Sequence, residues 1–254
     1  AIEENKDSLA LVFFSGVQYY TGQFFDLKAI SAKAHEIGAY AGFDCAHAAG
    51  NIDLQLHDWD VDFACWCTYK YLNSGPGCIG GAFLHEKHAN RKEDRLAGWW
   101  GHNAETRFDM TQPFEAIPGP FGYRLSNPPV VCTASLLGSL RVIEEAGGIK
   151  KLRKKSLLLT EYLEILFHEM IGEEIMILTP SNPKDRGCQL SLFFKRDEVL
   201  ERVAIAMETA PPICDIRKPN VMRVAPVPLY NSFSDVFNFV SWLKSVSNLG
   251  DSKL

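Results

Sequence analysis

The sequence predicts an α/β fold in which a mostly parallel sheet is followed by a smaller α+β domain. In the first third of the chain, apolar runs of strand length alternate with helical periodicity, an order that favours parallel strands joined by right-handed crossovers. From Val130 onward the helices and strands are mixed without that regular order. We therefore expect residues 1–130 to form part of a large domain and residues 131–254 to form a small C-terminal domain.

The first domain is expected to hold a strand–helix–strand order. Residues 26–38 predict a helix, because apolar side chains recur at helical spacing and Gly38 is a suitable C-terminal cap. The first and last expected strands are wholly apolar, which predicts that both are buried. The expected strands cover residues 9–14, 39–43, 61–68 and 79–84.

Residues 91–129 have weak periodicity and many glycine, proline and aromatic residues. The aromatic content argues against disorder, and long irregular segments in compact proteins are usually functional. We expect these residues to form loops over a site or at a subunit contact.

The second domain is expected to mix both element types. Pro226 must end the last expected strand or place it at a sheet edge. The expected helices cover residues 133–146, 152–170, 198–209 and 235–246, and the expected strands cover residues 174–179, 189–194 and 221–226.

The composition argues against several classes of protein. The 254 residues carry a net charge of -5 without a long run of either sign, so we expect no nucleic-acid partner. No apolar segment approaches the roughly 20 residues that span a bilayer, so we expect no membrane association. The 7 cysteines include no C-x-x-C pair, which favours reduced, buried thiols in a cytoplasmic protein without a metal site.

The strand end at Lys70 is the clearest sign of chemistry in the sequence. Tyr69 and Lys70 follow the apolar run 61–68, and the glycine-rich stretch 73–77 comes next. A lysine at a strand end can hold an aldehyde cofactor as a Schiff base, as pyridoxal phosphate enzymes require. For any single lysine of this kind, an exposed residue beginning a loop is the alternative.

Other strand ends support one shared site. Ser15 and Asp44 each close an apolar run, and the carboxyl ends of parallel strands meet at one edge, where ligands gather. We therefore expect Ser15, Asp44 and Lys70 to lie near one another. Asp44 suits a charged pyridinium nitrogen, and Ser15 suits a phosphate. His47 could contact the cofactor, although a satisfied core histidine is the alternative for His47 alone.

Several segments of the chain resemble kynureninase, a fold-type-I pyridoxal phosphate enzyme family of tryptophan catabolism. The resemblance runs over essentially the whole chain and implies a fold-type-I transferase-like fold. It also implies hydrolysis of the Cβ–Cγ bond of L-kynurenine or 3-hydroxy-L-kynurenine to anthranilate or 3-hydroxyanthranilate and L-alanine, on the route to NAD. The segments that carry it are residues 43–47, 56–59, 61–72 (VDFACWCTYKYL) and 223–233 (RVAPVPLYNSF).

The resemblance further implies a homodimer with its site at the subunit interface, and a role for individual residues. Lys70 matches the Schiff-base lysine, Asp44 the partner of the pyridine nitrogen, and Tyr69 a phosphate contact and proton donor. Arg223 matches an arginine that grips the substrate carboxylate, with a strand-end ion pair as the alternative. The implied cofactor-binding residues are Ser15, Asp44, His47, Tyr69, Lys70, Trp99 and Asn127, and the implied substrate-binding residues are Ser126, Asn127 and Arg223.

Two rival functions remain open at this point. A cysteine desulfurase has a related fold but needs a catalytic cysteine on a mobile loop, whereas most cysteines here lie in apolar runs. A non-catalytic fragment or isoform that associates with a full-length partner is the second rival. Kynureninase chains are longer at their N-terminus, so we expect this chain alone to be poorly soluble or dependent on a partner, and without kynurenine cleavage of its own.

Overall fold

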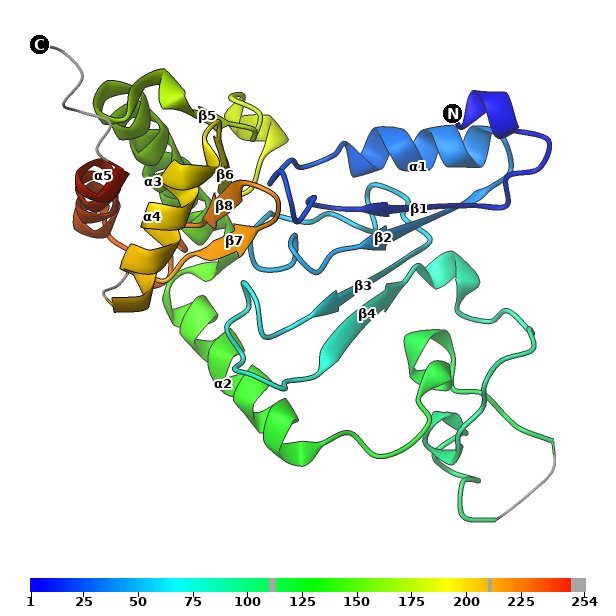
Figure 1. The fold of residues 1–254 in the computed structure, drawn as a ribbon. Coiled ribbons are helices and arrows are strands. Elements are labelled where there is room, and N and C mark those ends of the chain that lie inside the picture. Colours follow the sequence, from blue (N-terminus) through cyan, green and yellow to red (C-terminus); the bar gives the residue numbers. More distant parts are fainter. Residues whose placement is uncertain (110–112, 210–211, 248–254) are drawn as a thin grey trace, which may run out of the picture. The chain divides into compact units, whose positions relative to one another are not determined.

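The computed structural model describes residues 1–109, 113–209 and 212–247, which form two compact units (Figure 1). The first unit comprises Ala1–Gly16, Asp26–Ala49 and Leu54–Arg141, and the second comprises Val17–Phe25, Gly50–Asp53 and Val142–Leu254. Two short stretches from the beginning of the chain therefore fold with its C-terminal half.

The sheet of the first unit has the order β1-β2-β3-β4. The first three strands are parallel, and the last runs antiparallel to its neighbour, so the predicted mostly parallel sheet is confirmed. The strands are β1 (Leu11–Ser15), β2 (Tyr40–Asp44), β3 (Phe63–Cys67) and β4 (Gly80–Leu84).

The helix α1 (Leu27–Glu36) connects β1 to β2 and confirms the predicted helix. Asp26 begins it by accepting a hydrogen bond from the amide of Ala29 at 2.9 Å. Gly38 follows the helix with φ +78°, a left-handed conformation that glycine adopts without steric cost. The helix therefore ends at the residue that the sequence indicates.

The predicted burial of the outer strands is wrong. The β1 side chains of Leu11, Phe13 and Phe14 are 43%, 50% and 44% exposed. The side chains of β4 are half-buried or exposed. Both strands lie at edges of the described sheet, with a hydrogen-bonded neighbour on one side only. An apolar run reports strand propensity, but it does not report whether another element covers that strand.

The segment between β4 and the next helix contains only short 3-10 turns within its described residues, in agreement with its weak periodicity. The turns are η2 (Glu86–His88), η3 (Trp99–Gly101) and η4 (Gly119–Tyr123). Gly98 is required by close packing, because a Cβ there would lie 2.1 Å from the carbonyl oxygen of Leu125. Helix α2 (Val130–Glu145) then follows, and most of its side chains are exposed.

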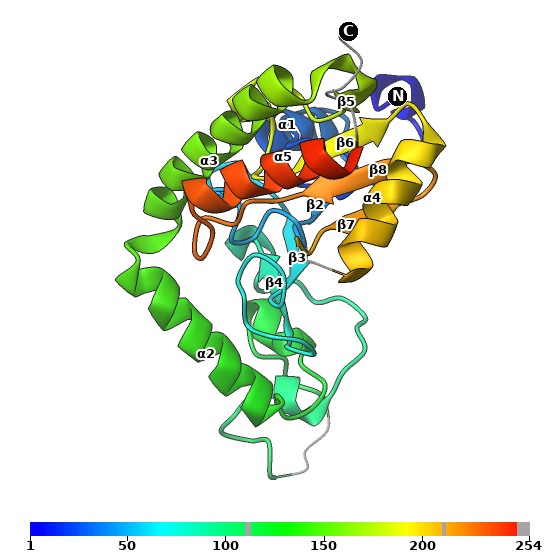
Figure 2. The same ribbon diagram turned by 60° about the vertical axis from the view of Figure 1, so that its left-hand side comes forward.

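The second unit contains an antiparallel sheet with the order β5-β6-β8-β7 and three helices. Helices α3 and α5 pack side by side (Figure 2). The sequence predicted every one of these elements except β7, which has only 3 residues. The elements are α3 (Gly148–Met170), β5 (Ile175–Ile177), β6 (Leu190–Phe194), α4 (Asp197–Thr209), β7 (Asp215–Arg217), β8 (Val221–Val224) and α5 (Phe233–Ser247).

The early stretches of the second unit are held by side chains that lie far away in the sequence. The hydroxyl of Thr179 donates to the carbonyl of Thr21 at 2.6 Å, and the hydroxyl of Ser191 donates to the carbonyl of Tyr20 at 2.5 Å. The amide of Cys188 donates to the side-chain oxygen of Asn51 at 3.0 Å. These contacts explain why residues 17–25 and 50–53 fold with the C-terminal half.

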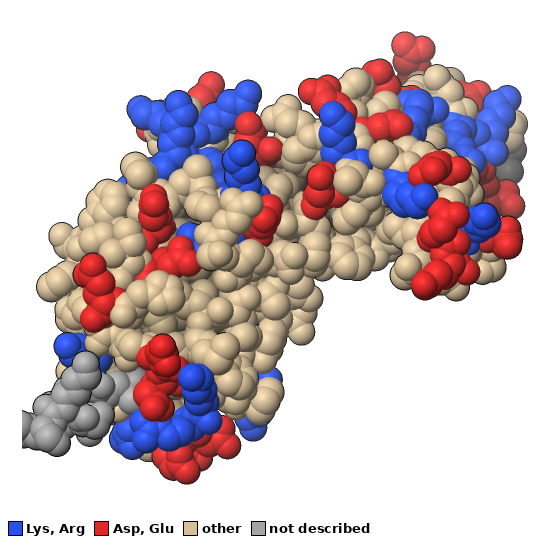
Figure 3. All heavy atoms as spheres, turned by 90° about the horizontal axis from the view of Figure 1, so that it is seen from above, with Lys and Arg blue, Asp and Glu red and all other residues tan. Residues whose placement is uncertain are grey.

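The cysteines are free thiols, but the expectation that they are buried holds only for Cys45 and Cys188, since Cys65 is exposed and the others are half-buried. No helix in the described ranges is long and apolar enough to cross a membrane. Within the same residues, no group of three histidine, cysteine or acidic side chains is arranged for a metal ion. Acidic and basic side chains are interspersed on the face that Figure 3 shows.

Candidate functional site

The carboxyl ends of the parallel strands bring Ser15 and Asp44 together. Ser15 pairs with Asp44 in the register of β1 and β2, and Asp44 pairs with Cys65 in the register of β2 and β3. Neighbouring strands in a sheet are about 4.8 Å apart, so these three residues form a row across the sheet. The registers therefore place Ser15 beside Asp44 in the first unit, and the position of Lys70 relative to them stays a prediction.

Asp44 offers a fixed carboxylate at this edge. The side chain is exposed, and its Oδ1 accepts a hydrogen bond from the amide of Ala46 at 2.8 Å. This contact between a carboxylate and an amide two residues later closes a tight turn and sets the side-chain direction. A carboxylate held in this way can pair with a protonated ring nitrogen of a bound ligand.

Lys70 and Tyr69 follow the adjacent strand β3. The Lys70 side chain is half-buried, and its Nζ lies 5.9 Å from the centre of the Tyr69 ring. Tyr69 is 49% exposed, and the charge and the hydrogen bond of the neighbouring Cys67 sulfur raise the pKa of its phenol above the ordinary value. A phenol is protonated at neutral pH even at its ordinary pKa, so Tyr69 has a proton to donate.

His47 lies beside the same loop. Its ring meets the ring of Tyr71 edge-on, with the centroids 6.0 Å apart. The thiol of Cys67 approaches the carbonyl of Ala46 at 3.9 Å. The turn after Asp44 and the loop around Lys70 therefore contact each other, as a shared ligand site requires.

The loop that carries Lys70 is fixed by buried hydroxyl groups that sequence reasoning missed. The Thr68 hydroxyl donates to the carbonyl of Ile79 at 2.5 Å, and the Ser74 hydroxyl donates to Thr68 Oγ1 at 2.7 Å. Both Thr68 and Ser74 are 1% exposed. Asn73 adopts a left-handed conformation with φ +55°, which turns the chain back toward β4.

Helix α2 provides further anchors for this loop. The Ser135 hydroxyl donates to the carbonyl of Ser74 at 2.5 Å, and the Ser139 hydroxyl donates to that of Leu72. The two serines are four residues apart and therefore lie on the same face of the helix. The sequence shows the spacing of these two serines, but only the structure identifies the loop carbonyls that they bind.

Three further predicted residues, Trp99, Ser126 and Asn127, lie in the irregular segment between β4 and α2. The Trp99 ring packs edge-on against the rings of Trp100 and Phe108, with centroid distances of 5.6 Å and 5.2 Å. Ser126 and Asn127 are exposed in the irregular segment before α2.

Arg223 lies on β8 in the second unit. Its guanidinium donates through Nη1 to the carbonyl of Tyr19 at 2.9 Å and pairs through Nη2 with the carboxylate of Asp215. The side chain is 13% exposed. The ion pair that the sequence left open as an alternative for Arg223 is thus present.

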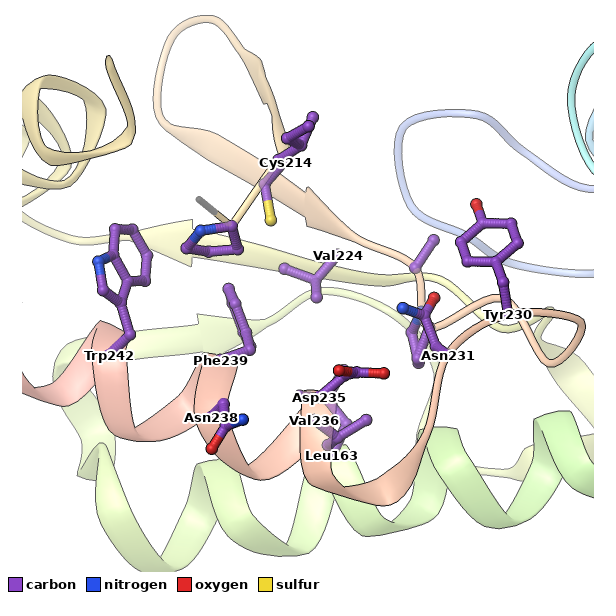
Figure 4. Close-up of a pocket in the computed structure, with 14 residues that line it drawn as sticks. Leu163, Cys214, Val224, Tyr230, Asn231, Asp235, Val236, Asn238, Phe239 and Trp242 are labelled. Atoms are coloured by element: carbon purple, nitrogen blue, oxygen red, sulfur yellow. The ribbon is translucent and has the colours of Figure 1, made fainter. Parts of the chain in front are cut away.

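A separate pocket of about 730 Å³ lies in the second unit, beside α5 and β8 (Figure 4). Its lining is mostly apolar and includes Phe239 and Trp242. Cys214 points into it, and burial, with a smaller effect of Asp215, raises the pKa of its thiol to about 12. This cysteine therefore stays protonated at neutral pH, which argues against a nucleophilic role.

Sequence comparison finds close relatives. Residues 152–243 match the family model described as the kynureninase C-terminal domain. The chain is 51% identical to the kynureninase of Monosiga brevicollis and 48% identical to that of Homo sapiens, over 99% of its own length and 55% of theirs. The chain thus spans about half the length of the curated relatives that it matches.

Structure comparison identifies the fold. A cysteine desulfurase from Thermococcus onnurineus NA1 superposes with a TM-score of 0.74 at 18% identity, covering 97% of this chain and 62% of that one. A C-DES variant with glycine covalently linked to its PLP cofactor gives 0.79 at 17% identity, covering 97% and 64%. The fold is therefore that of the fold-type-I PLP enzymes, and these similarities establish nothing beyond the fold.

Proposed function

The chain belongs to the kynureninase family, and on that premise we propose that the protein hydrolyses L-kynurenine or 3-hydroxy-L-kynurenine. Water is consumed, the Cβ–Cγ bond breaks, the aryl carbonyl becomes the carboxylate of anthranilate or 3-hydroxyanthranilate, and the remainder leaves as L-alanine. The observation that carries the proposal is an identity of 48–52% with several kynureninases over nearly the whole chain.

Pyridoxal phosphate is the cofactor of this function, and the residues at the sheet edge fit it. Lys70 offers a half-buried amine, and Asp44 offers a carboxylate fixed by its own turn. When bound, the cofactor supplies an electron sink for negative charge at the substrate Cα. Asp44 would hold the proton on the ring nitrogen, and Ser15 would donate to the phosphate.

The remaining steps are assigned to side chains of this chain. Lys70 would take the Cα proton once the substrate has displaced it, and Tyr69 would return a proton to the carbon that becomes the alanine methyl group. Arg223 would bind the substrate carboxylate.

The other assignments complete the proposal. His47, Trp99 and Asn127 would contact the cofactor, and Ser126 and Asn127 would lie near the aromatic end of the substrate. The large and small domains would be residues 1–130 and 131–254. The protein would act as a cytoplasmic homodimer with its site at the subunit interface, in tryptophan catabolism leading to NAD.

The deciding experiment measures alanine and anthranilate release by the full-length protein with L-kynurenine and 3-hydroxy-L-kynurenine. L-cysteine is the comparison substrate, since sulfide release from it with no anthranilate from either kynurenine would overturn the proposal in favour of a desulfurase. The desulfurase alternative is not favoured, because the chain is only 17–18% identical to the cysteine desulfurases of similar fold.

The assignment of Lys70 has its own test. Borohydride treatment of the cofactor-loaded full-length protein should fix the cofactor to Lys70, as shown by peptide mapping. Lys70→Ala should remove turnover while the circular dichroism spectrum stays unchanged. Lys150→Ala is the matched control, because that side chain is 77% exposed and should be dispensable. A label on another lysine would contradict the assignment.

A further inference from the structure

Arg223 and Asp215 form a cross-strand pair in the second unit. They lie directly opposite each other in the antiparallel register of β7 and β8. Asp215 Oδ2 contacts Arg223 Nη2, while the other terminal nitrogen of Arg223 donates to the Tyr19 carbonyl at 2.9 Å. The guanidinium is therefore held on two sides by groups of the chain itself.

One donor of this guanidinium is not used. The Nε of Arg223 is buried and has no hydrogen-bond partner among the described residues. A buried donor without a partner costs free energy, so the unpaired Nε beside the paired Nη2 indicates a position where a further acceptor could bind. Nε and Nη2 are neighbouring donors of a guanidinium, which binds a carboxylate with two parallel hydrogen bonds. Asp215 engages one donor of the two that such a carboxylate would use.

Asp215 also has a second cationic partner. The Nε of Arg217, two residues along the same strand, lies 3.0 Å from Asp215 Oδ2. Asp215 and Arg217 are 46% and 47% exposed, whereas Arg223 is 13% exposed. The carboxylate thus lies between an exposed guanidinium and a buried one, and it can leave the buried one without becoming unpaired.

We propose that Asp215 is a stand-in for the substrate carboxylate. In the absence of substrate, Asp215 forms an ion pair with Arg223. When substrate binds, Asp215 releases Arg223 and keeps its ion pair with Arg217. This inference rests on the proposed role of Arg223 as the carboxylate-binding residue. Asp215 keeps the buried guanidinium paired when no substrate is present. The substrate carboxylate then displaces it and gains the free Nε as well.

This competition makes Asp215 and Arg217 determinants of KM with opposite signs. Removing the Asp215 charge frees Arg223 for the substrate, so Asp215→Asn lowers KM. Removing the Arg217 charge takes away the alternative partner of Asp215, so Arg217→Gln raises KM. Each change is about two- to fivefold, the size expected for ion pairs with one half-exposed partner. The effect falls on KM rather than kcat, because the stand-in acts only before substrate is bound.

The experiment compares both variants, and their combination, in the full-length enzyme with L-kynurenine. In the Asp215→Asn background, Arg217→Gln should no longer raise KM, because Arg217 acts through Asp215. L-kynurenine amide, which lacks the carboxylate, supplies a second readout, since its inhibition constant should be the same in Asp215→Asn as in the parent enzyme. Thermal melting of each variant verifies folding.

An Asp215→Asn enzyme with a raised KM, or with a lowered kcat, would overturn the inference and make Asp215 a residue that orients Arg223. Arg217→Gln keeps the test decisive if Asp215→Asn does not fold, since an unchanged or lowered KM in that exposed variant contradicts the stand-in. Arg223→Gln tests the proposed role of Arg223 separately from that of Asp215. If it leaves KM unchanged, the proposed function of Arg223 fails, whatever Asp215 does.

Discussion

Asp44 illustrates how a single side chain is prepared for ligand chemistry by its local backbone. The strand β2 ends at this residue, and the amide of Ala46 fixes one carboxylate oxygen at 2.8 Å. The side chain does not have to be ordered when a ligand arrives, which reduces the entropy cost of binding. The same turn leads to His47, so one short segment supplies two of the proposed cofactor contacts.

Asp44→Asn should lower kcat more than it lowers cofactor content. Without the carboxylate the ring nitrogen loses its charged partner, an interaction worth about 1.5–3 kcal/mol, which corresponds to a loss of roughly 10- to 150-fold. Steady-state turnover and the cofactor absorbance of the full-length protein give the two quantities. Asp58→Asn is the control, because that carboxylate is 76% exposed. An unchanged kcat in Asp44→Asn would exclude the proposed role.

Strand β3 depends on a buried carboxylate at its start. Asp62 is 2% exposed and accepts hydrogen bonds from the amide of Ala41 at 2.7 Å and from His88 and His35 at 2.6 Å and 2.8 Å. Lys87 adds an ion pair at 2.9 Å. Burial alone would raise the pKa of Asp62, but these donors outweigh it and hold the pKa below its usual range.

Asp62→Asn should therefore destabilise the fold in a pH-dependent way. A lowered carboxyl pKa stabilises the folded state above the unfolded value of about 3.9, and this contribution is lost as the pH falls below it. We expect the free energy of unfolding to drop by about 1–3 kcal/mol at pH 7, with the difference shrinking toward pH 3. Urea titrations at both pH values measure this. A difference between the two proteins that does not depend on pH would contradict the assignment.

Helix α2 should control the order of the Lys70 loop through its serines. Replacing Ser135 and Ser139 together with alanine removes hydrogen bonds to two loop carbonyls, each worth about 0.5–1.5 kcal/mol. Amide hydrogen exchange of residues 70–78 should speed up accordingly. Thr133→Ala is the matched control on the same helix, because its hydroxyl donates to the carbonyl of Pro129, outside the loop that carries Lys70. Equal exchange in the double variant and the control would show that other contacts hold the loop.

The elements with clear periodicity were predictable, and those fixed by distant partners were not. Asp26 and Gly38 delimit α1 by local chemistry, which the sequence displays directly. Strand β7 is too short to show an alternating pattern, and the pairing of its residue Asp215 with Arg223 becomes visible only in the folded sheet. The membership of residues 17–25 in the second unit depends on hydrogen bonds that span more than 150 residues of sequence, and no local pattern encodes such contacts.

The candidate site was predictable to the same extent. The strand-end positions of Ser15, Asp44 and Lys70 follow from apolar runs, and the register of the sheet bears this placement out for the first two. The roles of these residues, and those of Trp99 and Asn127, remain predictions. The hydroxyl groups that anchor the Lys70 loop were missed, since serine and threonine occur in most loops and only a folded backbone shows which carbonyls they meet.

At the scale of the whole molecule, residues 1–254 leave much apolar surface uncovered. Large exposed apolar areas mark interaction sites or promote aggregation. The most exposed apolar side chains of β1 and α2 range from 43% to 83% in exposed fraction, and they are Leu11, Phe13, Phe14, Val130, Val131, Leu137, Leu140 and Val142. These surfaces are therefore where a partner subunit would be expected to pack.

Residues 1–254 produced alone should therefore bind hydrophobic dyes and self-associate as concentration rises. Val131→Lys combined with Leu137→Lys should reduce both effects, because these side chains are 83% and 49% exposed and their replacement buries no charge. Sedimentation velocity and dye fluorescence at several concentrations measure the outcome. Ile205→Lys on α4 is the control, since that side chain is exposed elsewhere. A monomer without dye binding would contradict the prediction.

The folding of early residues with late ones also sets a schedule for biosynthesis. The carbonyls of Tyr20 and Thr21 leave the ribosome long before Ser191 and Thr179, their partners 171 and 158 residues later. At about 5–20 residues per second, translation takes on the order of ten seconds to cover that separation. During this interval residues 17–25, which connect β1 to α1, lack these hydrogen-bond partners. Ribosome-associated chaperones that bind exposed apolar strands would find their substrate in that window.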